Sequence, residues 1–184
     1  MLWLPSGSPV HRSAPAGNVR DRLAMLALAT AGRAHFRIDA AELDSGEPTY
    51  TVQTLTRLRA QLGSARPIAL LLGSDSFLSL PTWLRWRELF ELAHFAVASR
   101  PGHPLDDAGM SPELAAQIAG RSVPAERLAA SAAGRIARFD MPPVDISSSA
   151  VRAALAAGRN ARHLLPAPVL AYIESQHLYL KETH

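Results

Sequence analysis

The sequence predicts an α/β protein with a mostly parallel sheet flanked by helices. Apolar runs alternate along the chain with segments whose apolar positions recur at helical spacing, which is typical of βα units. The length of 184 residues and the hydrophobic content of 48% suit one compact domain with a sizeable core. We therefore expect a single domain over residues 1–184, in which residues 147–184 form a C-terminal helical part.

The strands are predicted from short apolar runs that end in polar loops. Residues 68–72 (Ile-Ala-Leu-Leu-Leu) lead into Gly73-Ser74-Asp75, and we expect them to form a central parallel strand buried on both faces. Residues 94–98 have the same form and lead into Ser99 and Arg100. The weaker candidates are residues 2–4, 36–38 and 135–139.

The helices are predicted from the spacing of apolar residues. Residues 19–31, 51–62 and 82–92 follow this pattern, and we expect a helix over each. Residues 103–133 are polar, rich in alanine and interrupted by prolines, which indicates loops with one or two short surface helices. Two helices should close the chain, one after Ser147 and one after residues 166–168. In the last helix an apolar stripe should pack on the domain through Val169, Leu170, Ile173 and Leu178.

The composition excludes several functional classes. Cysteine is absent, so the chain has no disulfide, thiolate nucleophile or cysteine metal site. The net charge is +3, and the basic residues, all arginine except Lys181, are scattered along the chain, which argues against a nucleic-acid groove. The apolar start is too short for a signal peptide, and no run approaches the length of a membrane span. We expect a cytoplasmic protein without nucleic-acid or membrane partners.

The segment from Ile146 to Arg152 (Ile-Ser-Ser-Ser-Ala-Val-Arg) indicates a phosphate-binding helix start. Backbone N–H groups and the helix dipole favour an anion there, and the serine hydroxyls add donors. Arg152 follows Ser148 by four residues and Ser149 by three, so it returns to the same face. An ordinary serine cap with a solvated arginine is the alternative interpretation.

Polar residues follow the predicted strands at the edge where ligands collect in open parallel sheets. His11 and Arg12 follow the first strand, Gly73 and Asp75 follow the central strand, and Arg100 follows the strand after it. Gly73 would let a ligand approach the backbone, and Asp75 could accept hydrogen bonds from ribose hydroxyls. A turn glycine with a capping aspartate is an equally ordinary interpretation.

Two aromatic and hydroxyl-rich segments indicate the kind of ligand. Trp83 and Trp86 lie three residues apart, and Trp83 could stack a heteroaromatic ring, whereas we favour a core position for Trp86. Tyr50 and Thr51 belong to a loop with three hydroxyl side chains that opens a helix. A threonine cap on an amphipathic helix would explain the same loop.

Together these residues resemble the bacterial nicotinate-nucleotide adenylyltransferases, a family with a Rossmann-like nucleotidyltransferase fold. The match covers nearly the whole chain, and its motifs occur in the family's order. The matching segments are residues 9–12, 48–55, 72–75, 80–83, 100–102, 146–152 and 164–173.

The resemblance implies adenylyl transfer from ATP to nicotinate mononucleotide, which gives nicotinate adenine dinucleotide and pyrophosphate in NAD biosynthesis. It places Trp83 on the pyridine ring, and Tyr50 and Thr51 near the nicotinate carboxylate. It also implies Mg²⁺ carried chiefly by the triphosphate. The remaining roles are the ribose region for Gly73 and Asp75, the ATP phosphates for Ser147, Ser148 and Arg152, and supporting phosphate or substrate contacts for His11 and Arg100. Of these, Ser148 and Arg152 are the candidate catalytic residues.

The sequence departs from the family at its start. Members begin with a strand, a Gly-Gly-x-Phe-Asp-Pro-x-His-x-Gly-His motif and a long helix, whereas Met1–Leu4 correspond to the family's second strand. Roughly thirty residues of the first βα unit are therefore not in this sequence. We favour a translation start upstream of Met1. The alternatives are a truncated or degenerate homologue that binds nucleotide without catalysis, and an interaction protein without a nucleotide site, which the ordered motifs disfavour.

Overall fold

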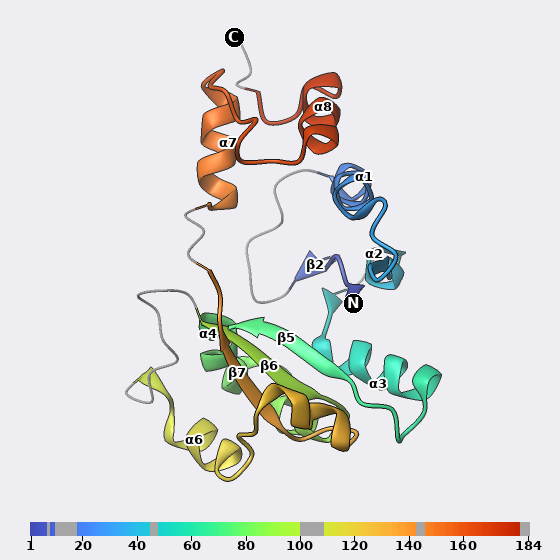
Figure 1. Ribbon diagram of the computed structural model, residues 1–184, viewed down its shortest axis with the longest axis vertical. Coiled ribbons are helices and arrows are strands. Elements are labelled where there is room, and N and C mark those ends of the chain that lie inside the picture. Colours follow the sequence, from blue (N-terminus) through green and yellow to red (C-terminus); the bar gives the residue numbers. More distant parts are fainter. Residues whose placement is uncertain (7, 10–17, 45–47, 100–108, 143–145, 181–184) are drawn as a thin grey trace. The chain divides into compact units, whose positions relative to one another are not determined.

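The computed structural model describes residues 1–6, 8–9, 18–44, 48–99, 109–142 and 146–180 (Figure 1). The chain divides into two compact units. Unit 1 comprises Met1–Thr49 and Val144–His184, and unit 2 comprises Tyr50–Pro143. This division does not test the single domain predicted over residues 1–184, which stays a prediction.

Unit 1 combines short parallel strands with helices from both ends of the chain. β1 pairs with β3 and β2 pairs with β4, both in parallel. The side chain of Asn18 caps the first helix by accepting a hydrogen bond from the Asp21 backbone N–H at 2.8 Å. The elements are β1 (Leu2–Trp3), β2 (Ser8–Pro9), α1 (Val19–Thr30), β3 (Arg37–Ile38), α2 (Ala41–Asp44), β4 (Pro48–Thr49), α7 (Ser148–Ala156) and α8 (Ala167–Ser175).

The core of unit 1 lies where α7 and α8 pack against α1. Val169, Leu170 and Ile173 are buried on α8, and Leu178 packs against the same cluster, as the apolar stripe predicts. Met25 and Leu28 contribute from α1. The last helix begins at Ala167, slightly earlier than expected. This packing sets the position of α7, which carries the predicted phosphate-binding residues.

Unit 2 contains a parallel sheet in the order β5-β6-β7 (Figure 1). Leu70 pairs with Phe95, which pairs with Ile136 on the other side. The elements are α3 (Thr51–Leu62), β5 (Ala69–Gly73), α4 (Ser74–Leu78), the 3₁₀ turns η1 (Leu80–Thr82) and η2 (Trp86–Glu88), α5 (Leu89–Leu92), β6 (His94–Ser99), α6 (Pro112–Ile118), η4 (Ala125–Ala130) and β7 (Ile136–Asp140).

Two details of the predicted sheet are wrong. β5 lies at one edge of the described three-stranded sheet and buries one face, because Leu70 and Leu72 are half-buried whereas Leu71 is 47% exposed. β6 is the strand with two neighbours, and five of its six residues are buried. In addition, the described strands form three separate parallel sheets rather than one. The pairs in unit 1 extend over only two residues each.

The helix predicted over residues 82–92 is also wrong. The chain forms η1, then η2, and only Leu89–Leu92 are α-helical. Trp83 is extended, and Arg85 adopts a left-handed conformation with φ 52°. A left-handed residue cannot continue a right-handed helix, so the apolar spacing here reflects packing of successive turns. Within the described residues, no helix is long and apolar enough to cross a membrane.

Candidate functional site

The N-terminus of α7 has the features of an anion-binding helix start. Ser147 is its N-cap, and the Ser147 Oγ accepts a hydrogen bond from the Ala150 backbone N–H at 3.1 Å. The ordinary capping interpretation is therefore correct for this hydroxyl. The hydroxyl proton of Ser147 can still be donated, and the first turn of α7 presents the positive end of the helix dipole.

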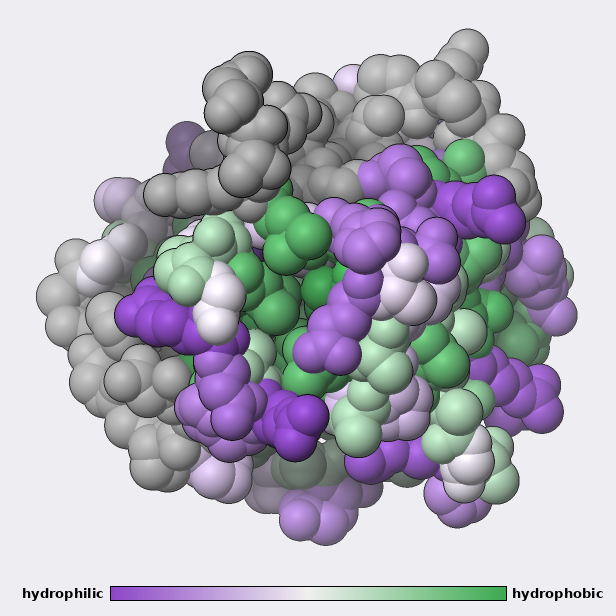
Figure 2. Space-filling view, turned by 90° about the horizontal axis from the view of Figure 1, so that it is seen from above, coloured by the Kyte–Doolittle hydropathy of each residue, from purple (hydrophilic) through white to green (hydrophobic). Residues whose placement is uncertain are grey.

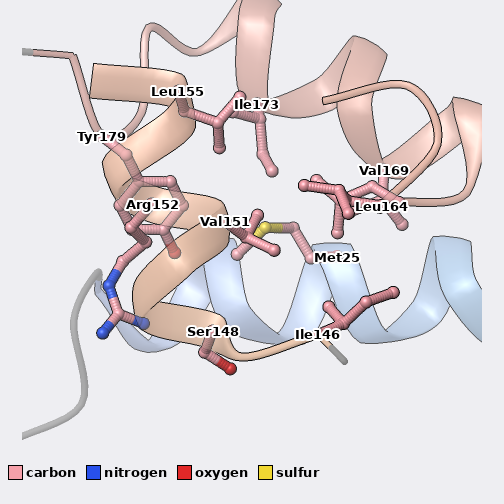
Figure 3. A pocket seen from close by; sticks show the side chains of 11 residues that line it. Met25, Ile146, Ser148, Val151, Arg152, Leu155, Leu164, Val169, Ile173 and Tyr179 are labelled. Carbon is pink, nitrogen blue, oxygen red and sulfur yellow. The ribbon is translucent and has the colours of Figure 1, made fainter. Parts of the chain in front are cut away.

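Ser148 and Arg152 line one pocket of unit 1, as their spacing on a helix predicts (Figure 3). Arg152 is half-buried, and its Nη2 donates to the Ser149 Oγ at 3.3 Å. This bond joins residues one turn apart and turns the guanidinium toward the serine-rich start of the helix. Hydroxyl donors and a guanidinium on one helix face can hold phosphate oxygens together.

In unit 2, β5 ends at Gly73, which is also the N-cap of α4. Gly73 is exposed and has ordinary backbone angles, and a Cβ there would meet no atom within 4 Å. The glycine therefore leaves open space rather than relieving strain. Asp75 is exposed in the first turn of α4, and the buried Ser74 donates from Oγ to the Ala98 carbonyl at 3.3 Å. Ser74 thus ties the end of β5 to the end of β6.

Tyr50 and Thr51 stand at the start of α3, and both are half-buried. The N-cap is Tyr50, so the interpretation as a threonine cap is wrong. The Tyr50 backbone N–H donates to the Gln53 Oε1 at 3.4 Å. Thr49, the preceding residue, donates from its hydroxyl to a Glu42 carboxylate oxygen at 3.2 Å.

Trp83 and Trp86 have the different environments that the sequence suggests. Trp86 is 6% exposed and packs edge-to-face with Phe90 at a centroid distance of 6.3 Å, so it belongs to the core. Trp83 is half-buried, and its Nε1 donates to the Ser79 Oγ at 3.3 Å. This bond fixes the indole plane while part of the ring stays accessible. Ser79 was missed from the sequence, although its position four residues before Trp83 could have indicated it.

An ion pair supports the turn that follows Trp83. Arg85 donates from Nε to one oxygen of Glu88 at 2.7 Å and from Nη2 to the other at 2.5 Å. The hydrogen bond from Arg85, helped by its charge, holds the pKa of Glu88 below its usual value, although desolvation opposes the shift. The bidentate contact offsets part of the cost of the left-handed backbone at Arg85.

The predicted site residues fall in both units. Unit 1 brings together Ser147, Ser148 and Arg152 on α7, whereas unit 2 holds Tyr50, Thr51, Gly73, Asp75 and Trp83. His11 and Arg100 lie outside the described residues. Within the described ranges, no group of three or more histidines, aspartates or glutamates is placed to hold a metal ion.

Comparisons with known proteins agree with the family resemblance of the sequence. The family described as Cytidylyltransferase-like matches residues 1–154. A probable nicotinate-nucleotide adenylyltransferase of Dechloromonas aromatica is 44% identical over 96% of this chain and 82% of its own length. One from Stenotrophomonas maltophilia is 45% identical over 98% of this chain and 83% of its own.

Among solved structures, nicotinic acid mononucleotide adenylyltransferase of Plasmodium falciparum, complexed with NaAD, has a TM-score of 0.67. It is 16% identical, and the match covers 97% of this chain and 81% of that one. This likeness shows the Rossmann-like fold. The sequence matches show that the chain belongs to the Cytidylyltransferase-like family, among the bacterial nicotinate-nucleotide adenylyltransferases.

Proposed function

We propose that this protein transfers the adenylyl group of ATP to nicotinate mononucleotide, giving nicotinate adenine dinucleotide and pyrophosphate in NAD biosynthesis. The observation that carries the proposal is the arrangement of Ser147, Ser148 and Arg152 at the start of α7 in a chain of this family. The names of the relatives support the choice of substrates.

The reaction forms one phosphorus–oxygen bond and breaks another. A phosphate oxygen of the mononucleotide attacks the α-phosphorus of ATP, and the bond to the β-phosphate oxygen breaks, so that pyrophosphate leaves. The attacking oxygen is already ionised at neutral pH, so the step needs neither a general base nor a covalent enzyme intermediate. Positioning and charge stabilisation carry the catalysis. Arg152 and the Ser148 hydroxyl would bind the phosphate oxygens on which negative charge grows.

Residues of unit 2 would hold the mononucleotide. Trp83, with its indole fixed by Ser79, would stack on the pyridine ring. Tyr50 and Thr51 can donate hydrogen bonds to the nicotinate carboxylate. Asp75 would accept from ribose hydroxyls beside the open space at Gly73. His11 and Arg100 are proposed as supporting phosphate or substrate contacts.

We further propose that Mg²⁺ enters with ATP and is held chiefly by the triphosphate. Mg²⁺ prefers hard oxygen ligands and retains several waters, and phosphate oxygens meet this preference. The ion would neutralise charge on the leaving pyrophosphate. If the Mg²⁺ concentration that gives half the maximal rate changes with the ATP concentration, the proposal is supported. If that Mg²⁺ concentration stays the same at every ATP concentration, the proposal is contradicted. We also propose a cytoplasmic location, which fractionation of the native cells can test.

The test is a pair of substitutions with opposite expected effects. Arg152→Ala should lower kcat by about 100- to 1000-fold, because it removes charge stabilisation. Trp83→Ala should weaken mononucleotide binding by about 5- to 150-fold, because stacking on one aromatic ring contributes about 1–3 kcal/mol. The matched controls are Arg159→Ala, which removes an exposed arginine, and Leu84→Ala, which trims the exposed neighbour of Trp83.

The assay follows pyrophosphate release and dinucleotide formation by the full chain. Equal effects of the site variants and their controls would refute the site assignment. If the protein binds nicotinate mononucleotide and quenches tryptophan emission, but forms no product, it is a nucleotide-binding homologue and the proposed reaction is wrong.

A further inference from the structure

The pocket that contains Ser148 and Arg152 extends beyond what phosphate binding requires. It has a volume of about 280 Å³, close to the lower limit of about 300 Å³ for typical small-molecule sites. Most of its lining is aliphatic and comes from α1, α7 and α8 and the segments that flank them. A triphosphate is strongly hydrated and gains little from such a wall.

The polar groups of this pocket lie at its margin. Figure 3 shows the side chains of Met25, Val151 and Ile173 turned toward one another, with the Arg152 guanidinium and the Ser148 hydroxyl at the edge of the group. Figure 2, which is seen from above relative to Figure 1, shows apolar surface between polar side chains. The lining therefore has an apolar floor and a hydrogen-bonding rim.

The charge of the rim selects the sign of the ligand. Arg152 is the one charged residue among the eleven described residues that line the pocket, and none of the eleven is acidic. A neutral apolar ligand would make no favourable electrostatic contact with the Arg152 guanidinium, and a cation would be repelled by it. A ligand with an anionic head and an apolar body satisfies both parts of the lining.

We propose that this pocket binds a small carboxylate with an apolar tail, with its head on Arg152 and Ser148 and its tail between α1, α7 and α8. Such an anion would compete with the ATP phosphates for Arg152 and Ser148, so its regulatory effect rests on the proposed function. Its binding to the pocket does not. Binding of an amphiphilic carboxylate to this pocket would thus lower the rate of adenylyl transfer when such carboxylates accumulate.

The test uses methionine methyl groups as local probes of the full chain. The sequence has four methionines, of which Met25 lines the pocket. With ¹³C in the methionine methyls, octanoate should shift the Met25 signal saturably and leave the signals of Met1, Met110 and Met141 in place. Met25→Leu assigns the signal. A Met25 signal that does not move, or four signals that move alike, would overturn the proposal.

The contribution of the anionic head is measured with octanol, which has the same chain without the charge. Octanoate should bind at least about tenfold more tightly than octanol, and Arg152→Ala should remove that difference. Lengthening heptanoate to octanoate should tighten binding by up to about fourfold, because one more methylene is buried. Equal binding of octanol and octanoate would overturn the role of Arg152.

Filling the pocket gives a second, independent measurement. Leu164→Phe enlarges a half-buried side chain that lines the pocket and should abolish binding, whereas Leu178→Phe enlarges a neighbour outside the lining and should preserve it. Inorganic triphosphate should displace octanoate and return the Met25 signal, and simultaneous binding would overturn the competition. These measurements need neither ATP nor the mononucleotide, so they succeed or fail independently of adenylyl transfer.

Discussion

The Arg59 side chain joins separate segments of unit 2, and replacing it should destabilise the protein. Arg59 lies on α3 and is half-buried. Its Nη2 donates to the Leu92 carbonyl and, at 3.1 Å, to the Ala132 carbonyl, which precede β6 and β7. Its Nη1 donates to three carbonyls that follow α3, those of Gly63, Ser64 and Arg66.

The magnitude follows from the two long-range bonds. Arg59→Met retains most of the aliphatic stem and removes the guanidinium. Each hydrogen bond to a charged group contributes about 1.5–3 kcal/mol, but bonds that share one group are not additive. The carbonyls after α3 are exposed, so water replaces those bonds. We expect a loss of about 2–4 kcal/mol, which lowers Tm by roughly 5–15 °C for a chain of this length.

The assay is unfolding in urea, monitored by tryptophan fluorescence. The buried Trp86 lies in the same unit and reports its unfolding. Arg57→Met is the matched control, because Arg57 lies on the same helix and donates to the nearby Gln61 at the surface. It should change stability by less than about 0.5 kcal/mol. If Arg59→Met is no more harmful than Arg57→Met, the long-range bonds do not stabilise the unit.

Two further predictions concern pH. The Tyr172 hydroxyl donates to Asp21 at 2.8 Å, and this bond raises the pKa of Tyr172. The bond therefore stabilises the folded state fully at pH values below the ordinary tyrosine pKa of about 10. This stabilisation is lost as the pH rises through the raised pKa. Absorbance of tyrosinate should show one late-titrating phenol that Tyr172→Phe removes, and simultaneous titration of all three tyrosines would contradict it. Arg85 lowers the pKa of Glu88. The stabilisation of the folded state by this ion pair is therefore present above about pH 4.3 and is lost as the pH falls through the lowered pKa. Glu88→Gln should flatten the acid limb of the urea midpoint, and an unchanged limb would refute the role of this pair.

The sequence predicts the elements whose signal is local. The helices at α1 and α3 begin and end within one residue of the expected ranges, because apolar spacing and their start residues specify them. The strands β5, β6 and β7 follow from their apolar runs in the same way. The burial of β5 could not be predicted, because an apolar run does not show how many neighbours a strand has.

The segment around Trp83 shows how packing can imitate a helix. The side chains of Trp86 and Phe90 do pack together at helical spacing, as the pattern indicates. The backbone between Trp83 and Trp86 nevertheless breaks, because Arg85 is left-handed and is held by Glu88. Glycine would have indicated a left-handed turn, whereas arginine at this position gives no such signal.

In the candidate site, too, local sequence patterns predict some features, whereas others depend on contacts between distant residues. Ser147, Ser148 and Arg152 lie within two turns of one helix, so their spacing alone predicts a shared surface. The orientation of that helix depends on contacts that no local pattern contains. The hydrogen bond from Tyr172 to Asp21 joins residues 151 positions apart and links α8 to α1. Because Val169 and Ile173 of α8 pack in the same cluster as Val151 of α7, this polar bond helps to hold the helix that carries Arg152. Sequence patterns thus predict the chemical groups of the site, whereas distant polar pairs determine where those groups are held.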